Sequence, residues 1–160
     1  MDAIPISVNF LILRGVFPGD FNTTTPKKVT PVETIYTEIP KTFTGVANWP
    51  TSSNLKCWEC DQMPDSYPKF IPQYPTMNQS GDTCSVFGHF DEWSCAVRYV
   101  RREFPAMQQW DTLKMLCIFE SKFSGKLKNA LPEAPPKTLM KAYCGSGGIT
   151  LQEFKALQQL

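Results

Sequence analysis

A Cys-x-x-Cys knuckle, formed by Cys57 and Cys60, constrains the fold of this 160-residue chain more than any other feature. The turn between two such cysteines lets both thiolates face one centre while backbone N–H groups point at their sulfurs. A third cysteine, Cys95, lies at the start of an expected helix and can reach the same centre from the first turn. We therefore predict a small metal-binding module, with zinc as the metal that such cysteine sets hold.

The cysteine count and the start of the chain bear on its compartment. Six cysteines could form three disulfides in a secreted protein. The beginning of the sequence does not read as a secretory signal, because Asp2 stands where a basic residue is expected and Arg14 interrupts the first apolar run. No apolar run approaches the roughly 20 residues that cross a bilayer. We therefore expect a reducing compartment and no membrane partner.

The length allows one ordinary domain, or a small domain with an arm, and the 14 prolines place much of the chain in loops or extended segments. We predict an α+β fold in which a small zinc-stapled module of β-hairpin and helix is followed by C-terminal helices. The expected divisions are an extended N-terminal arm at residues 1–48, the zinc-binding module at residues 49–104 and a C-terminal helical region at residues 105–160. The arm is expected to contain one strand, at residues 6–17.

Local patterns place the elements of the module. The prolines between residues 61 and 79 forbid a helix there, so large apolar side chains of this segment are expected to cover the metal from a loop. These side chains are Tyr67, Phe70, Ile71 and Tyr74. A short strand is expected at residues 83–90, where the sequence alternates. The residues of one face of this strand are Cys84, Val86, Gly88 and Phe90.

Helices are expected after the strand. Apolar residues repeat at helical spacing over residues 93–104, and Pro105 ends this helix. A second helix is expected at about residues 106–123, with Trp110 in its apolar set and Gly125 as its stop.

The C-terminal region contains two further helical signals. Pro136 can open a short helix through Tyr143, and Thr150, just before the last ten residues, forms a capping box with Glu153. We therefore predict a terminal helix. Cys117 and Cys144, which lie outside the module, are expected to be buried as small apolar side chains: free cysteine is among the most buried residue types.

Charge is unevenly distributed although the formal net charge is only +1. Residues 57–97 contain one lysine against six acidic residues, whereas residues 98–141 contain nine Lys or Arg against four acidic residues. Nucleic-acid affinity comes mostly from contacts between cations and phosphates, so the acidic knuckle segment is not expected to bind phosphates. Nucleic acid, if bound, is expected to contact the later helices through Arg98, Arg101 and Arg102. A solvated helix face is the alternative for these arginines.

Several motifs together resemble a known family. The knuckle follows Trp49-Pro50. After it come a proline-spaced insert, Gly88-x-Phe90, the helix that carries Cys95-Ala96 and a proline-helix-Gly-Gly ending. Over roughly residues 49–154 this order resembles the MYM/FCS-type zinc-finger proteins of large nucleocytoplasmic DNA viruses. Within that group it is similar to relatives of the poxvirus late gene transcription factor two. That resemblance implies a zinc-dependent regulator of late viral genes.

One position departs from that family, whose helix starts with Phe-Cys-Ser. Asp91 stands where the resemblance implies a cysteine ligand. Aspartate oxygen ligates zinc at about 2.0–2.2 Å, so it can replace the thiolate. The predicted zinc ligands are Cys57, Cys60, Asp91 and Cys95. Two alternatives stay open: Asp91 is only the helix N-cap and His89 or Cys84 completes the site, or the metal is weakly held or absent.

The sequence favours an interaction protein over an enzyme. His89 is the only histidine, and no other group is recognisably placed to work with it, so no catalytic residue is predicted. The first hypothesis is a late gene transcription factor that acts with the viral RNA polymerase or other viral proteins in the viral factory of the host cytoplasm. The alternative is a virion or capsid-assembly protein in which a structural zinc staples a small scaffold. Packaging in the virion is compatible with both.

Overall fold

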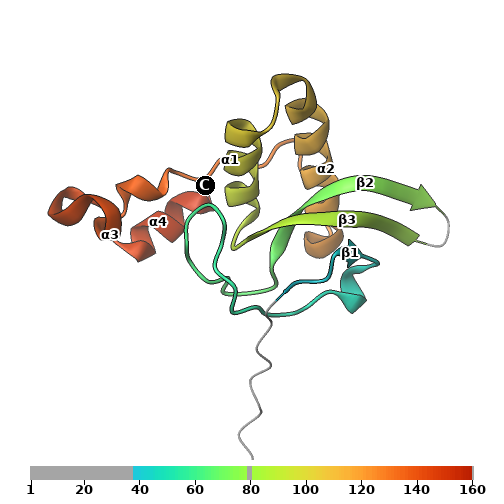
Figure 1. Ribbon diagram of the computed structural model, residues 1–160, viewed down its shortest axis with the longest axis horizontal. Helices are drawn as coiled ribbons and strands as arrows, with labels where there is room; N and C mark the ends of the chain where they lie inside the picture. The colour runs from blue at the N-terminus through green and yellow to red at the C-terminus, as the bar shows by residue number, and fades with distance from the viewer. Residues whose placement is uncertain (1–37, 79–80, 160) are drawn as a thin grey trace, which may run out of the picture. The chain divides into compact units, whose positions relative to one another are not determined.

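The computed structural model describes residues 38–78 and 81–159, which belong to one compact unit. The fold is mixed α+β, as predicted: the described residues form a three-stranded antiparallel sheet and four α-helices (Figure 1). The predicted strand at residues 6–17, like most of the predicted arm, lies outside the described residues. The division of the chain at residues 48 and 104 stays a prediction.

The sheet consists of a long hairpin and one short edge strand. The hairpin is formed by β2 (Lys69–Asn78) and β3 (Gly81–Phe90), while β1 (Thr42–Phe43) pairs with the other edge of β3. The order is therefore β1-β3-β2. The strand predicted at residues 83–90 is confirmed as part of the central strand. Strand β3 ends at residue 90, so only two residues connect it to helix α1 (Trp93–Glu103).

The loop predicted over residues 61–79 is wrong from Lys69 onward, where the chain forms β2. Prolines are tolerated in an edge strand, because its outer N–H groups have no ladder partner to lose. The pairing of β2 also shifts register on both sides of Pro72. Tyr74 has a φ of 48° within the second shift and is 85% exposed, so it does not cover the predicted site. Phe70, by contrast, is fully buried.

Gly88 interrupts the regular course of β3. It has a φ of +75°, and a Cβ added there would lie 2.6 Å from a carbon of the Phe90 ring, so larger residues are disfavoured. The pairing of β3 with β2 shifts register next to this position. The predicted alternation ends here, because Gly88, His89 and Phe90 are all buried.

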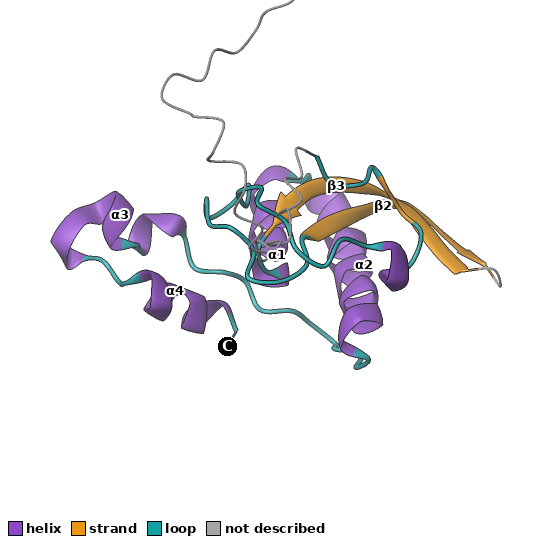
Figure 2. Cartoon of the chain, turned by 90° about the horizontal axis from the view of Figure 1, so that it is seen from below, coloured by secondary structure: helices purple, strands orange, loops and turns teal. Residues whose placement is uncertain are grey.

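Helices α1 and α2 (Ala106–Ser124) pack against each other, and both contact strand β2 of the hairpin (Figures 1 and 2). The helices predicted at residues 93–104 and 106–123 are confirmed. Gly125 follows α2 with the left-handed φ of 72° that a glycine C-cap supplies. Trp110 is 67% exposed, so its predicted place in the apolar face is wrong. None of the described helices is long and apolar enough to span a membrane.

The chain after α2 returns toward the module through short helical elements. These are η3 (Lys137–Leu139), α3 (Lys141–Cys144), η4 (Gly145–Gly147) and α4 (Leu151–Gln158). The predicted capping box is confirmed, since the Thr150 hydroxyl accepts from the Glu153 N–H and the Glu153 carboxylate accepts from the Thr150 N–H. Phe154 of α4 is fully buried. Cys144 is exposed, so its predicted burial is wrong.

An aromatic core joins the sheet to the helices. Phe43 of β1 lies 5.3 Å from Phe70 of β2 and 5.4 Å from Phe119 of α2, measured between ring centroids. Each of these three side chains is at most 1% exposed. The indole N–H of the buried Trp49 has a hydrogen-bond partner, because it donates to the Pro68 carbonyl at 2.8 Å. Phe43, which lies in the described end of the predicted arm, is therefore part of the core.

Candidate metal centre

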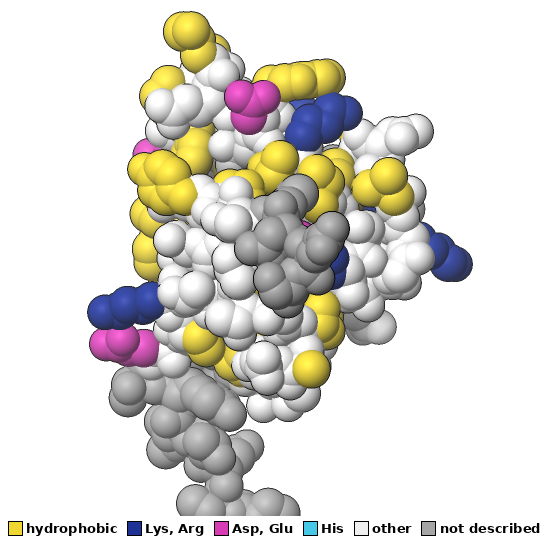
Figure 3. Space-filling view, turned by 90° about the vertical axis from the view of Figure 1, so that its right-hand side faces the viewer, with side chains coloured by type: hydrophobic (Ala, Val, Ile, Leu, Met, Phe, Trp, Pro, Cys, Tyr) yellow, Lys and Arg dark blue, Asp and Glu magenta, His cyan; other side chains and the backbone are white. Residues whose placement is uncertain are grey.

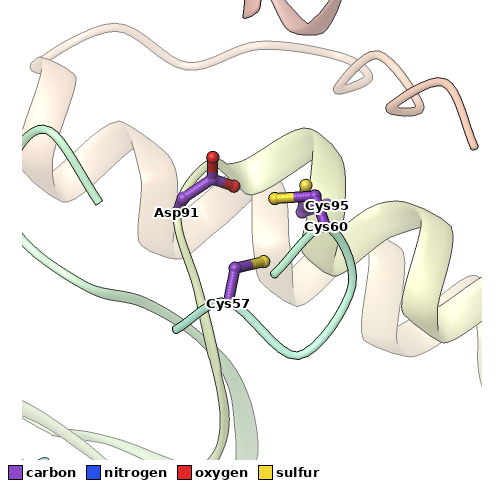
Figure 4. Close-up of side chains that lie close together, drawn as sticks. All are labelled: Cys57, Cys60, Asp91 and Cys95. Atoms are coloured by element: carbon purple, nitrogen blue, oxygen red, sulfur yellow. The ribbon is translucent and has the colours of Figure 1, made fainter. Parts of the chain in front are cut away.

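Four buried side chains converge at the start of α1, and their donor atoms all lie within 4.8 Å of one another (Figure 4). They are Cys57, Cys60, Asp91 and Cys95. The first two come from the knuckle loop, the aspartate follows β3, and the third cysteine lies in the first turn of α1. None of the four is more than 3% exposed. The structure thus brings together the four residues that the sequence predicts as ligands.

The knuckle is a tight turn held by its own backbone. The Cys57 N–H donates to the Gln62 carbonyl at 2.8 Å, and the Asp61 N–H donates to the Cys57 carbonyl at 3.1 Å. Asp61 has a φ of 61°, a left-handed conformation that aspartate adopts more readily than most residues. The Glu59 N–H donates to the Cys57 sulfur at 3.4 Å. This turn therefore presents both sulfurs to one side, as a metal knuckle requires.

Burial makes the cluster a poor place for uncompensated negative charge. Desolvation raises the pKa of Asp91 to about 6, and the charge of Cys57 adds to the increase. Burial also opposes ionisation of Cys57, but hydrogen bonds from Cys60 and Cys95 outweigh it and lower that pKa. The Oδ1 atom of Asp91 is buried without a hydrogen-bond partner. A cation would neutralise these groups and ligate that oxygen, so the residues fit a metal such as zinc.

The two alternative ligands lie outside this cluster. The Nε2 atom of His89 is 2.9 Å from the Ser53 hydroxyl, and burial lowers the pKa of His89. Cys84 belongs to the hydrophobic core, where burial raises its pKa to about 12. Within the described chain, the donor atoms around the three clustered sulfurs include Asp91 and neither of these two side chains. The structure therefore favours Asp91 as the fourth candidate ligand.

The other interpretation of Asp91, as the N-cap of α1, is wrong. The helix begins at Trp93 and its N-cap is Glu92, which makes no capping hydrogen bond with its side chain. The Cys95 N–H instead donates to the Glu92 carbonyl at 3.1 Å, within the first turn. Figure 4 shows the Asp91 carboxylate on the same side as the sulfurs.

A side chain from the end of the chain completes the surroundings of the cluster. Gln158 of α4 is 3% exposed, and its Nε2 atom donates to the Cys95 sulfur at 3.0 Å. This residue is not predicted from the sequence, because a glutamine near a helix end has no local feature that marks it. The available signal was its spacing: Gln158 lies four residues after the buried Phe154 and therefore on the same face of α4.

A second contact fixes the C-terminal segment to the knuckle. The Asp61 carboxylate accepts hydrogen bonds from the Lys137 ammonium at 2.8 Å and from the Tyr143 hydroxyl at 2.6 Å. These bonds lower the pKa of Asp61 and raise the pKa of Tyr143 to about 12. The residues after α2 therefore hold the turn that carries both knuckle cysteines.

The three arginines predicted to bind nucleic acid all form ion pairs within the chain. Glu59 of the knuckle is 2% exposed, and its Oε1 atom lies 3.2 Å from Arg98 Nε and 2.7 Å from Arg102 Nη1. The Nε atom of Arg101 lies 3.2 Å from the Glu133 carboxylate. Two of the three arginines thus hold α1 to the knuckle. Their contact with nucleic acid stays a prediction.

The fold and the cluster together define a small mixed α+β protein with a candidate metal centre of three cysteines and one aspartate. Its sequence is similar to the uncharacterized protein B175L of African swine fever virus. The B175L proteins of the Pretoriuskop isolate and the Badajoz strain are 32% identical to it over 109 residues, or 68% of this chain and 62% of the relative. The protein of a Kenyan isolate is 30% identical over the same length.

These matches make the chain a homologue of a viral protein, and it spans less than two thirds of the length of these relatives. No family model matches the sequence. No solved structure matches it either. The similarity agrees with the viral part of the resemblance that the motifs indicate.

Proposed function

We propose that this protein is a zinc-binding viral regulator that performs no chemistry of its own and acts in late gene transcription with the viral RNA polymerase. The observation that carries the proposal is the buried cluster of three cysteines and Asp91, with donor atoms within 4.8 Å of one another. Four protein ligands complete the tetrahedral shell of a structural zinc site, whereas a catalytic site keeps one position for water.

The surroundings of the cluster support a structural role for the metal. The Gln158 amide and the Glu59 N–H each donate to a cysteine sulfur, which orients the sulfur toward the centre. His89 lies near Ser53, a pair that occurs in hydrolases. Here the Ser53 hydroxyl also accepts from the Leu55 N–H at 3.1 Å and is part of a local turn. We therefore assign no catalytic role to this pair.

The transcription role rests on the motifs and on the viral relatives. The order of knuckle, insert, helix and Gly-Gly ending is similar to relatives of the poxvirus late gene transcription factor two. The homology to a protein of African swine fever virus supports a viral origin of the chain. On this proposal the partners are the viral transcription machinery or other viral proteins, and the site of action is the viral factory in the host cytoplasm.

A virion or capsid-assembly role is the second candidate, and exposed apolar side chains favour it. Tyr74 is 85% exposed, Met107 is 93% exposed and Trp110 is 67% exposed. On the face turned toward the viewer in Figure 3, apolar side chains lie at the surface among polar ones. Apolar groups at a surface often mark contacts with other proteins. A structural protein needs such contacts, as does a regulator that binds a polymerase.

Depletion of the protein during infection tests the two candidates side by side. Late mRNA and capsid assembly are measured in the same cells over time. A regulator of transcription should lose late mRNA first, with capsid defects that follow from missing late proteins. A structural component should leave late mRNA unchanged while capsids fail to assemble.

Complementation then tests whether the metal centre is required. Cys95→Ser should fail to restore function, because it removes a ligand from a buried site. Cys144→Ser is the matched control, since it changes an exposed cysteine outside the cluster, and it should restore function fully. Restoration by both variants would contradict a role for the zinc centre.

A further inference from the structure

We propose that the pocket between Trp58 and the part of β3 that β1 leaves uncovered binds an extended segment of a partner protein. This segment carries a large apolar side chain next to carboxylates. This proposal deepens the proposed function and rests on it, because Trp58 stands between the two cysteines of the knuckle. Recruitment of the regulator would then occur beside the metal centre.

The pocket lies where the pairing of β3 with β1 stops. The Val86 N–H donates to the Lys41 carbonyl at 2.9 Å, and a pocket of about 420 Å³ opens beyond this bond, over Phe87. On its other side the Trp58 N–H donates to the His89 carbonyl at 2.8 Å. The pocket therefore adjoins a short stretch of strand edge between two points of backbone pairing. Extended segments of partner proteins dock along such edges.

Aromatic surface lines this pocket. The Trp58 side chain is 50% exposed, and its ring centroid lies 5.5 Å from that of Phe87 in an edge-to-face arrangement. Tryptophan is enriched among the residues that contribute most to the stability of protein complexes. The pocket volume falls within the range of about 300–1,000 Å³ typical of binding sites. The aromatic lining therefore favours a large apolar side chain as the buried group.

The rim of the pocket carries two exposed lysines, Lys41 and Lys56, and one acidic residue, Glu38. Within the described residues neither lysine forms an ion pair. The cations of α1, by contrast, are already paired with carboxylates of this chain; they are Arg98, Arg101 and Arg102. Lysines that have no carboxylate partner among the described residues favour carboxylates on the partner protein.

A protein segment fits these features better than a nucleic acid does. Nucleic-acid surfaces use several cations along the path of a phosphate backbone. Here a glutamate stands beside the two lysines, and the space between them is largely apolar. An acidic and apolar segment satisfies both features, because its side chain contacts the aromatic rings while its carboxylates contact the lysines.

Selection from a random peptide library displayed on phage, with the zinc-loaded full-length protein as bait, tests the proposal. Enriched sequences should carry a large apolar residue next to Asp or Glu. A synthetic peptide of enriched sequence should lose about tenfold or more in affinity for Trp58→Ala. Trp110→Ala is the matched control, because it removes an exposed tryptophan from α2, and it should bind as the wild type does.

A second variant separates binding from packing. The Trp58 ring also lies 6.3 Å from that of Phe90 and 6.0 Å from that of Tyr99, so its removal disturbs the fold around β3. Lys41→Glu combined with Lys56→Glu changes only exposed side chains. This double variant should weaken binding of the acidic peptides and reduce its dependence on salt.

Zinc content, measured on each protein, distinguishes failure of this proposal from failure of the proposed function. A folded wild-type protein without zinc overturns the metal centre. A zinc-loaded protein that enriches no acidic, apolar peptide overturns the peptide pocket, as does equal binding to the wild type and both pocket variants. Displacement of the peptide by a short single-stranded oligonucleotide would also overturn it, because the surface would then recognise nucleic acid.

Discussion

A single carboxylate, Asp91, decides what the cysteine cluster can hold. Three thiolates and one carboxylate form a mixed set of soft and hard donors, which zinc accepts because it is a borderline-soft ion without a geometric preference from its d electrons. The buried Oδ1 atom lacks a hydrogen-bond partner, and a buried charge without a partner is strongly unfavourable. A bound metal would therefore compensate a charge that burial opposes.

Substitutions of Asp91 test its role as a ligand. Asp91→Ala should lower zinc affinity on the order of 100-fold or more, because loss of a residue that only hydrogen bonds to a ligand already lowers it about 10–100-fold. Asp91→Cys should retain zinc, since it supplies a fourth thiolate. Competition with a chromogenic chelator measures both affinities.

His89→Ala and Cys84→Ala are the controls for this experiment, because both side chains lie outside the cluster. Both variants should retain zinc as tightly as the wild type. Release of zinc from either of them, together with retention in Asp91→Ala, would show that the ligand set is wrong.

The cluster could be predicted from the sequence because its four residues form two pairs that are closely spaced along the chain. Cys57 and Cys60 share one turn, and Asp91 and Cys95 flank the start of one helix, so each pair is local. The contact from Gln158 could not be predicted in this way. It joins residues 63 positions apart, and only the packing of α4 brings them together.

Helix α4 links the end of the described chain to the metal centre. Its capping box and the buried Phe154 fix its position, and Gln158 on the same face reaches the Cys95 sulfur. A thiolate that accepts a hydrogen bond is stabilised in its charged form, which is the form that binds zinc. Zinc binding and docking of α4 should therefore be coupled.

Gln158→Ala tests this coupling. The variant should lower zinc affinity about 10–100-fold, the effect typical of a lost partner of a metal ligand. Hydrogen exchange of the α4 amides should also become faster, because the helix loses its contact with the cluster. Gln159→Ala, which changes the exposed neighbour, should alter neither property. Unchanged zinc affinity in Gln158→Ala would contradict the coupling.

The hairpin shows where local patterns are insufficient. The prolines in residues 69–78 predict a loop, and they do exclude a helix, but the chain forms a strand there. Whether a proline breaks a strand depends on whether its missing N–H faces a neighbour. That depends on the position of β2 at the edge of the sheet, which is a property of the whole fold.

Gly88→Ala tests the bend in β3. The positive φ and the close approach to the Phe90 ring should together lower the free energy of unfolding by about 1–3 kcal/mol. Gly147→Ala is the control, since nothing lies within 4 Å of its added Cβ, and it should have little effect. Urea denaturation of the zinc-loaded proteins measures both values. Equal stability of the two variants would argue against strain at Gly88.

Across the described chain, acidic residues of the segment 57–97 find cations as partners, and three of them, Glu59, Asp61 and Asp82, pair with the basic segment 98–141. Of the six acidic residues between positions 57 and 97, five form ion pairs with lysines or arginines, and the sixth is Asp91. The partners lie on α1, α2, β2, η3 and α4. The exposed pairs among them contribute only about 0–1 kcal/mol each, so their main effect is to select which surfaces meet, whereas the pairs of Glu59 and Lys69 each include a buried side chain. The sequence predicts the two charge blocks, but which carboxylate pairs with which cation emerges only in the fold.

Arg98 and Arg101 differ in what they hold together, and this difference gives a prediction for stability. Arg98→Ala removes a partner of the buried Glu59 and a hydrogen bond at 3.2 Å to the Ala134 carbonyl, so it should lower the free energy of unfolding by about 1–3 kcal/mol. Arg101→Ala removes only a pair with the exposed Glu133 and should change it by about 0.5 kcal/mol or less. Similar losses in urea denaturation would show that Glu59 does not depend on Arg98.

Because Arg101→Ala should leave the fold intact, it is also the cleanest test of nucleic-acid contact by α1. A phosphate contact made by Arg101 should weaken binding to all oligonucleotide sequences alike and lower the slope of log affinity against log salt concentration by about one. Arg98→Ala is unsuitable for this purpose, since any loss of binding would also reflect a disturbed knuckle. An unchanged slope in Arg101→Ala would remove Arg101 from any nucleic-acid surface. Binding of partners would then depend on protein contacts such as those proposed at Trp58.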